Sequence, residues 1–339
     1  MNQKHAATTT TTKKKAAAAR RSARRAELAL ALRVSRLRLL SRVAPAEAAR
    51  RAFALWVTPN RLPWPERELA VREAAAVSRV PHAGREGRIE LAVYRWGAER
   101  ADAPLVLLVH GWEGRATQLG ALVGPLVAAG YGVVALDLPG HGASGGVTTD
   151  LPDMAAAVRA VGDGVLPEGA ALRAIVAHSL GGPAALLAVG AGLAAERVVT
   201  IGSPTKMTIA RDTFLGRLKL APRATDGVIS AIEARLGDDC WERYRAETTA
   251  AALEVPGLVV HDSEDGEVTH GHALELAVAW RGARVLLTRG LGHRRILRDP
   301  GVVDAVSRFI DAPLEGLTRG EKPWYASWSA TSSTASSAG

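Results

Sequence analysis

The residues best suited to chemistry in this chain of 339 residues are a serine, a histidine and a carboxylate that lie far apart in the sequence. Ser179 stands in Ala-His-Ser-Leu-Gly, between an apolar run and a helix-favouring stretch. This pattern is typical of a nucleophile raised on a tight turn from strand to helix. Such a turn needs small residues two positions before and after the nucleophile, as Ala177 and Gly181 are. His293 follows a Gly-Leu-Gly turn, and Asp265 lies in an acidic loop before it.

These three residue types together favour acyl transfer. A serine hydroxyl is a poor nucleophile at neutral pH, so a base must take its proton during attack. Histidine suits that task because its ordinary pKa lies near neutral pH. A carboxylate behind the imidazole fixes the tautomer, and preorganised N–H donors stabilise the oxyanion. The alternative for Ser179 alone is a helix-capping serine, because serine is a favoured N-cap residue.

From residue 76 onward, short apolar runs alternate with helical patterns. The first two runs form a predicted hairpin, with strands at 76–80 and 88–96 around a Gly-Arg-Glu-Gly turn. The later runs have the length and composition of buried strands, and lie at 105–109, 132–136, 173–177, 197–201, 258–261 and 284–287. Alternation of strands and helices predicts an α/β fold with a mostly parallel sheet covered by helices on both faces.

Four motifs in sequence order resemble those of the α/β-hydrolase family, over about residues 88 to 311. They are His-Gly-Trp-Glu-Gly at 110–114, Asp-Leu-Pro-Gly-His-Gly-Ala-Ser at 137–144, the Ser179 turn, and the acidic loop at 261–268 paired with Gly-Leu-Gly-His at 290–293. The order serine, acid, histidine is also the family's order. The resemblance implies an eight-stranded-type sheet, oxyanion donors at the backbone amides of Leu180 and Trp112, and no cofactor.

Three carboxylates compete for the acidic position. In the family, the acid usually precedes a hydrophobic residue by three positions. Asp265 fits this pattern through Val268, so the resemblance favours it. Asp262 ranks second because it lies closer to the end of the predicted strand, and Glu264 lies between them.

Other histidines compete with His293 for the role of base. The resemblance gives His110 the task of shaping the oxyanion loop. His141 lies in the turn after the second motif strand, and His178 is the variable residue of the Ser179 turn. Structural or solvated roles are the expectation for His261, His270 and His272, which surround the acidic loop. His110, His141 and His261 do not form a spaced cluster that resembles a zinc site, so we expect no metal.

The composition divides the chain into segments. Residues 1–25 are low in complexity and basic, which predicts a disordered arm. Residues 26–75 are expected to form a helical extension, and residues 76–312 the hydrolase domain. A mostly helical insertion at 205–254 is expected to form a lid over an apolar acyl pocket, with Trp112 lining the floor of that pocket. Residues 313–339 are expected to be a flexible tail.

The positive charge of the chain belongs to its N-terminal part. Residues 1–51 hold 14 Lys and Arg residues against two Glu, so the remainder of a chain with net charge +9 is slightly acidic. We therefore expect no nucleic-acid groove in the domain. Apolar residues recur at helical spacing between arginines, at Leu30, Val34, Leu37, Leu40 and Ala44. This pattern predicts an amphipathic helix that packs on the domain or makes weak contact with an anionic membrane.

The remaining features bear on location and origin. A single cysteine, Cys240, excludes an internal disulfide and fits a reducing compartment. No apolar run reaches the ~18 residues that a membrane span needs, so a cytoplasmic protein is expected. The abundance of Ala and Arg suggests a bacterial genome rich in GC.

The sequence thus predicts a serine esterase that cleaves a small-molecule carboxylic ester through an acyl-enzyme at Ser179. Three alternatives stay open. The same three residues can cleave an amide, a thioester or a carbon–carbon bond, and the fold can also serve a non-catalytic binding protein. The third is a hydrolase of lipid esters that associates with a membrane through the basic N-terminal helix. The sequence does not indicate the oligomeric state or the acyl preference.

Overall fold

The computed structural model describes residues 31–97, 102–314 and 325–329. The chain divides into two compact units. Unit 1 comprises the chain up to Trp56 together with Ala210–Asp238, and unit 2 comprises Val57–Ile209 together with Asp239–Gly339. Within the described residues, no helix is both long and apolar enough to cross a lipid bilayer.

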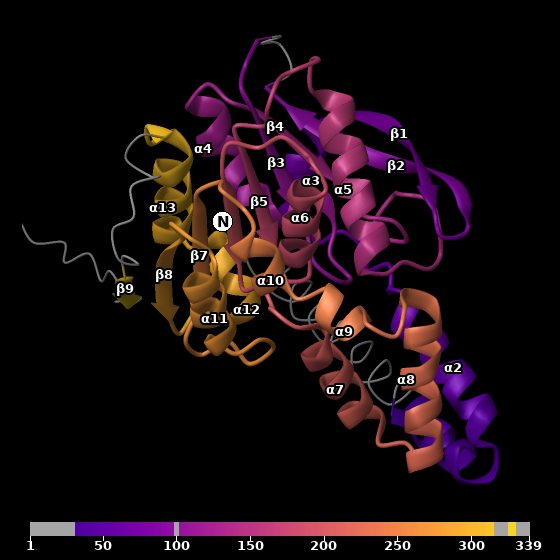
Figure 1. The fold of residues 1–339 in the computed structure, drawn as a ribbon. Coiled ribbons are helices and arrows are strands. Elements are labelled where there is room, and N and C mark those ends of the chain that lie inside the picture. The colour runs from indigo at the N-terminus through magenta and orange to yellow at the C-terminus, as the bar shows by residue number, and fades with distance from the viewer. Residues whose placement is uncertain (1–30, 98–101, 315–324, 330–339) are drawn as a thin grey trace, which may run out of the picture. The chain divides into compact units, whose positions relative to one another are not determined.

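Unit 2 is built on a single nine-stranded sheet (Figure 1). The strands follow the order β1-β2-β4-β3-β5-β6-β7-β8-β9. β2 runs antiparallel to both of its neighbours, and every other pairing is parallel. The strands are β1 Ala76–Gly84, β2 Gly87–Trp96, β3 Leu105–Val109, β4 Gly132–Leu136, β5 Ala174–His178, β6 Val198–Ile201, β7 Gly257–Asp262, β8 Arg284–Arg289 and β9 Tyr325–Ser329. The predicted mostly parallel sheet is confirmed.

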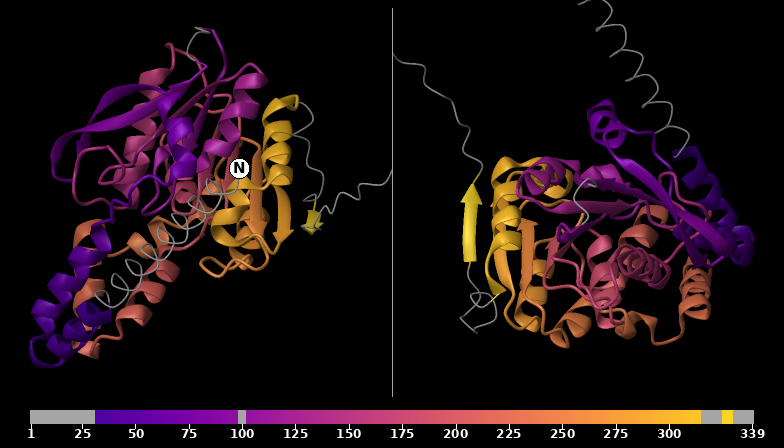
Figure 2. Two further views of the ribbon diagram at one scale, coloured as in Figure 1. Left: turned by 180° about the vertical axis from the view of Figure 1, so that it is seen from behind. Right: turned by 90° about the horizontal axis from the view of Figure 1, so that it is seen from above.

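The central strands are apolar because both of their faces are covered. Every residue of β3, β4, β5 and β6 is buried. Helices lie on both faces of the sheet, as predicted (Figure 2). Apolar side chains of η1 Ala116–Leu122, α4 Val123–Ala128 and α13 Pro300–Asp311 share a core with strand residues on one face.

The second layer of helices is contiguous. α5 Leu151–Val165 packs against α6 Gly181–Gly190, and α10 Ala246–Ala251 contacts both α6 and α11 Gly271–Ala279. The Asp150 side chain caps α5 by accepting a hydrogen bond from the Asp153 N–H, which explains where this helix begins.

The ninth strand lies inside the segment 313–339, for which the sequence predicted a flexible tail. Its backbone pairs in parallel with β8, from Tyr325 opposite Val285 to Ser329 opposite Arg289. Without β9, the outer N–H and C=O groups of β8 would form a free edge, and strand addition supplies partners for them. Composition alone did not reveal this pairing.

Unit 1 is helical and joins two distant parts of the sequence. Its members are a helix at residues 31–43, termed the N-terminal helix below, α2 Pro45–Val57, most of α7 Met207–Leu218, and α8 Pro222–Leu236. A helix lies where the sequence predicted one between residues 30 and 44, and helices make up much of the insertion. α3 Glu66–Glu73, in unit 2, completes the helices of the predicted extension.

Specific contacts hold the N-terminal segment to the insertion. The guanidinium of Arg38 donates to the carbonyl of Leu218 over 2.7 Å. The rings of Trp56 and Phe214 meet edge to face, with centroids 5.3 Å apart. The N-terminal helices therefore pack on the inserted helices. The lid function expected of the insertion stays a prediction.

Candidate active site

Ser179 occupies a strained turn between β5 and α6. Its φ is +53°, in the left-handed region that residues with a side chain rarely adopt. Its N–H donates to the carbonyl of Ile201 over 2.9 Å, and its carbonyl accepts the N–H of Gly182 over 2.9 Å. These bonds on both sides hold the strained backbone in place. Strain of this kind is concentrated at functional sites, where surrounding structure maintains it.

A small residue is required at Gly181, as the sequence indicated. In the structure, the atoms nearest to a Cβ built on Gly181 belong to the backbone at the end of β3, including the Val109 carbonyl oxygen at 2.9 Å. The start of α6 therefore packs directly on β3, and any side chain at this position would push the two apart.

Three side chains from separate loops meet beside this turn. The Nε2 atom of His293 lies 3.0 Å from Ser179 Oγ, and its Nδ1 atom lies 2.7 Å from Asp265 Oδ2. The imidazole can thus accept the serine proton at one nitrogen while its other N–H donates to the carboxylate. The side chains of His293 and Asp265 are only 6% and 1% exposed, so water does not weaken their hydrogen bond.

Asp265 is held in its ionised form. Burial raises the pKa of this carboxyl group, but the hydrogen bond from His293 and the backbone N–H groups of Val268 and Glu267 outweigh burial and lower it overall. The Oδ1 atom accepts those two N–H groups over 3.0 and 2.8 Å. The Oδ2 atom therefore faces the imidazole with a fixed orientation.

Asp262, the second candidate for the acid, has different partners. Its Oδ2 atom accepts the Thr288 hydroxyl at 2.7 Å and the Leu291 N–H at 3.0 Å, and its Oδ1 atom accepts the Glu264 N–H at 3.0 Å. Burial raises its pKa, and these donors lower it further than burial raises it. Asp262 thus joins the acidic loop to the segment that carries His293, and the structure places Asp265 against the imidazole.

His178 lies beneath the imidazole of His293. Its Nε2–H donates to the backbone carbonyl of His293 over 2.9 Å, and the two rings are 4.7 Å apart. Burial and the neighbouring His293 lower the pKa of His178 to about 3, so this ring is neutral. His178, the residue before Ser179, therefore holds the backbone of His293, the proposed base.

The loop expected to carry the oxyanion donors is fixed by a neutral histidine. The Nδ1–H of His110 donates to the Gly111 carbonyl over 2.6 Å, and its Nε2 accepts the Leu138 N–H over 3.0 Å. Burial lowers the pKa of His110 to about 4. Both ring nitrogens are engaged in the neutral form, so the prediction that His110 shapes this loop is confirmed.

His141 supports the same loop from the following turn. Its Nε2 accepts the Glu113 N–H over 3.0 Å, and its Nδ1–H donates to the Pro139 carbonyl over 2.9 Å. Burial and the neighbouring His110 lower its pKa to about 3. The carboxylate of Asp137 accepts the backbone N–H groups of Ala116 and Ala143, which joins the segment after the 110–114 loop to the turn at 137–144.

The amides of Trp112 and Leu180 lie on the two segments that meet at Ser179. A Cβ built on Gly111 would lie 2.7 Å from Ser179 Cβ and 3.3 Å from the Leu180 nitrogen, so the loop passes directly against the turn. Within the part of the chain that the structure describes, neither amide donates to another protein atom. Both N–H groups are therefore available to a bound oxygen.

The other histidines have structural partners or lie outside this cluster. His261 Nε2 donates to the Val268 carbonyl over 2.9 Å, and His272 Nδ1 lies 2.7 Å from the Thr205 hydroxyl. Among residues 31–97, 102–314 and 325–329, no group of three or more His, Cys, Asp or Glu side chains could hold a metal ion.

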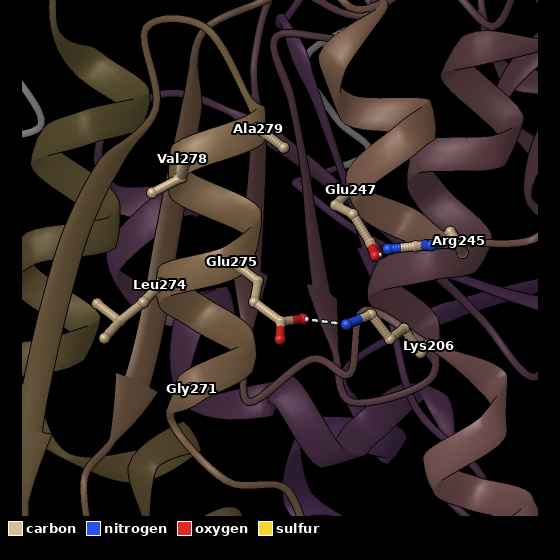
Figure 3. A pocket seen from close by; sticks show the side chains of 8 residues that line it. All are labelled: Lys206, Arg245, Glu247, Gly271, Leu274, Glu275, Val278 and Ala279. Carbon is tan, nitrogen blue, oxygen red and sulfur yellow. Dashed lines mark hydrogen bonds and ion pairs between the residues drawn. The ribbon is translucent and has the colours of Figure 1, made fainter.

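A separate pocket of about 460 Å³ opens between α10 and α11 (Figure 3). None of the three clustered side chains lines it. Its charges are paired with one another, since Lys206 Nζ lies 3.1 Å from Glu275 Oε2 and Arg245 Nε lies 2.7 Å from Glu247 Oε1. We assign this pocket no part in the chemistry at Ser179.

Two residues that support the cluster were missed by sequence reasoning. His178 occupies the variable position of the serine motif, and its bond to a main-chain group leaves no sequence signal. Arg61 lies in the predicted helical extension, yet its guanidinium donates to the carbonyls of Gly142 and Gly146 over 2.7 Å each. A lone arginine between the two prolines of Pro-Asn-Arg-Leu-Pro gave no indication of this role.

Comparison with known proteins identifies the family. The α/β hydrolase family matches residues 106–306, which is more than half of the chain. The chain therefore belongs to the α/β hydrolase family, as its motifs indicated. No protein of curated function matches the sequence.

Solved structures share the fold at low sequence identity. They include a thermophilic esterase from Thermogutta terrifontis (18% identity, TM-score 0.53, covering 70% of this chain and 98% of that one). An esterase from Rhodococcus sp. ECU1013 has 19% identity and a TM-score of 0.52, covering 70% and 98% of the two chains. A thioesterase domain from the curacin biosynthetic pathway has 18% identity and a TM-score of 0.51, covering 69% and 99%. At these identities the likeness concerns the fold.

Proposed function

We propose that the protein is a serine hydrolase that cleaves small carboxylic esters through an acyl-enzyme at Ser179. One observation carries the proposal. The hydrogen-bonded series from Ser179 Oγ to His293 Nε2, at 3.0 Å, and from His293 Nδ1 to Asp265 Oδ2, at 2.7 Å, joins a nucleophile, a base and an orienting carboxylate. This is the arrangement that nucleophilic catalysis by serine requires.

The residues define a balanced sequence of steps. Ser179 Oγ attacks the ester carbonyl while His293 Nε2 takes the hydroxyl proton, and the negative charge collects on the carbonyl oxygen. The N–H groups of Leu180 and Trp112 stabilise that oxygen. The intermediate collapses as His293 gives its proton to the departing alkoxide, which leaves as the alcohol. Water then attacks the acyl-enzyme as His293 takes its proton, the bond from Ser179 Oγ to the acyl carbon breaks, and His293 returns the proton to Ser179 as the carboxylic acid leaves.

An ester is the substrate class whose cleavage requires the fewest catalytic groups in addition to Ser179, His293 and Asp265. An alkoxide leaves more readily than an amide nitrogen, which must be protonated before its bond to carbon breaks. The fold is also shared by solved proteins described as esterases and as a thioesterase domain, so the fold leaves the bond type to experiment.

Labelling with a fluorophosphonate probe tests the nucleophile. We expect the wild-type protein to be labelled and Ser179→Ala to be unlabelled. Ser78→Ala, which changes an exposed serine on β1, is the matched control and should label like the wild type. Equal labelling of all three proteins would refute the assignment of Ser179.

Hydrolysis of matched substrates tests the bond type. An oxygen ester, a thioester and an amide that carry the same acyl group should be turned over in that order of kcat/KM. Preference for the amide or thioester would replace the ester proposal within the same chemistry. Absence of both labelling and turnover would favour the alternative of a binding protein on this fold.

A further inference from the structure

The N-terminal helix of unit 1 has an inner face that is fully engaged. Ser41 is 2% exposed, and its hydroxyl accepts the N–H of Ala221 over 2.9 Å. Arg38 donates to the Leu218 carbonyl over 2.7 Å. Leu37, one turn from Ser41, is 7% exposed. These contacts with the inserted helices establish which side of the helix faces the rest of unit 1.

The outer face of the same helix is apolar and exposed. Leu32, Leu39 and Val43 are 52%, 63% and 74% exposed. At about 100° per residue, their spacing of seven and four places them within roughly 40° of one another around the helix axis. We call these three residues the outer stripe. Large apolar side chains aligned in this way on a surface mark an interaction site.

Cations surround the outer stripe. Arg33, Arg36 and Arg42 are exposed on the same helix, and residues 28–46 contain no Asp or Glu. The preceding 27 residues add eight further Lys and Arg residues against one Glu. A partner that covers the outer stripe must therefore accept apolar side chains at its centre and supply negative charge around them.

We propose that the outer stripe binds the surface of a bilayer that contains anionic phospholipid. The acyl boundary accepts Leu32, Leu39 and Val43, while the headgroup phosphates pair with the flanking arginines. A second copy of the chain would bring one set of arginines against another, which is repulsive. A nucleic acid would supply phosphate but would leave the leucines without an apolar environment.

The engaged inner face fits this mode of binding. Because the inserted helices hold Leu37, Arg38 and Ser41, only the outer stripe of the described helix is free to meet a bilayer. Residues 31–43 therefore lie in the plane of the interface, with their inner face still held by unit 1. This inference is independent of the proposed esterase activity.

Sedimentation of the full-length protein with vesicles tests the proposal. We expect binding to vesicles of equal parts phosphatidylcholine and phosphatidylserine, weakened by salt, and little binding to phosphatidylcholine alone. The double variant Leu39→Gln, Val43→Gln should bind the anionic vesicles at least about ten-fold more weakly, because two apolar side chains are lost. The double variant Arg36→Gln, Arg42→Gln should lose about five-fold for each arginine.

Matched controls separate the stripe from general surface effects. Val278→Gln, which changes an 81% exposed valine of α11, and Arg281→Gln, at an exposed arginine, should bind as the wild type does. All variants should keep their unfolding midpoint, because the changed side chains are exposed.

Three results would overturn the proposal. The first is equal binding to neutral and anionic vesicles, or to neither. The second is anionic binding that Leu39→Gln, Val43→Gln leaves intact, which would attribute binding to charge alone. The third is a dimer, or a complex with an acidic protein or RNA, that forms through the outer stripe without any vesicle binding.

Discussion

The Nε2–H of His178 donates to the backbone carbonyl of His293 over 2.9 Å. The proposed nucleophile and base are thereby joined twice, once through Ser179 Oγ and once through the residue that precedes Ser179 in the chain. We therefore expect His178 to position the imidazole, acting on the reacting atoms through His293.

Replacing His178 should test this linkage. We expect His178→Phe to lower kcat by roughly ten- to one-hundred-fold with a small change in KM, because a misplaced imidazole is a poor base. His178→Gln retains an N–H donor and should recover much of the loss. Steady-state kinetics with an ester substrate, together with unfolding midpoints, make the comparison. Equal kcat values for the two variants would show that the hydrogen bond does not position His293.

Substitutions at the two aspartates of the acidic loop should change different properties, kcat in one case and stability in the other. Asp265→Asn should lower kcat by about 10⁴-fold at an unchanged unfolding midpoint, since an amide presents the wrong hydrogen-bonding pattern to His293. Asp262→Asn should chiefly lower stability, because Asp262 joins Thr288, Leu291 and Glu264. Measurement of kcat and of urea denaturation on both variants decides the assignment. A larger loss of kcat in Asp262→Asn would exchange their roles.

Gly202 offers a test of the space around the imidazole. Its φ is +59°, and a Cβ there would lie 3.3 Å from His293 Nδ1 and 3.5 Å from Asp265 Oδ2. Gly202→Ala should therefore disturb the bond between them and lower kcat by about ten-fold or more. Gly266→Ala is the control in the same region, because a Cβ at Gly266 meets no atom within 4 Å. Kinetics that are the same for both variants would contradict the expected crowding.

Stability should fall in mild acid. Burial, the largest cause in each case, lowers the pKa of His110 to about 4 and of His141 and His178 to about 3, from an ordinary value of 6.5. Below pH 6.5 the unfolded chain binds protons that the folded protein excludes. The free energy of unfolding is therefore highest above pH 6.5 and falls as the pH is lowered toward 4, by about 1 kcal/mol per pH unit for each histidine.

Urea denaturation at several pH values between 7 and 5 measures this slope. His178→Gln should make the free energy of unfolding depend less steeply on pH. The reduction should correspond to one proton fewer taken up on unfolding, because one of the three neutral imidazoles is removed. A slope that is unchanged in the variant, or a wild-type protein that is more stable at pH 5 than at pH 7, would contradict the prediction.

Much of the fold could be predicted because the residues of each strand and turn are determined by that element's own burial and backbone geometry. The predicted strands at 105–109 and 132–136 agree with β3 and β4 to the residue, since fully buried strands are apolar at every position. Ser179 and His293 were proposed as site residues because the turns that carry them need small neighbours in the sequence. A tight turn admits only small residues at certain positions, so a single sequence is enough to recognise such a motif.

The remaining features depend on contacts between distant segments. Helical periodicity showed that Leu37 would be buried, but it carried no information that the inserted helices would cover it. His178 binds a carbonyl, which any residue supplies, so no second side chain indicated its role. The choice between Asp262 and Asp265 likewise rests on loop geometry that the spacing of the residues does not determine.

Unit 1 makes two distant segments of the chain depend on each other. Trp56 and Phe214 pack together although β1 to β6 lie between them in the chain. The inserted helices would lose a hydrophobic partner if the leading helices were absent, and the reverse is equally true. Each segment therefore depends on the other for burial of its apolar side chains, and we expect deletion of either one to destabilise the other.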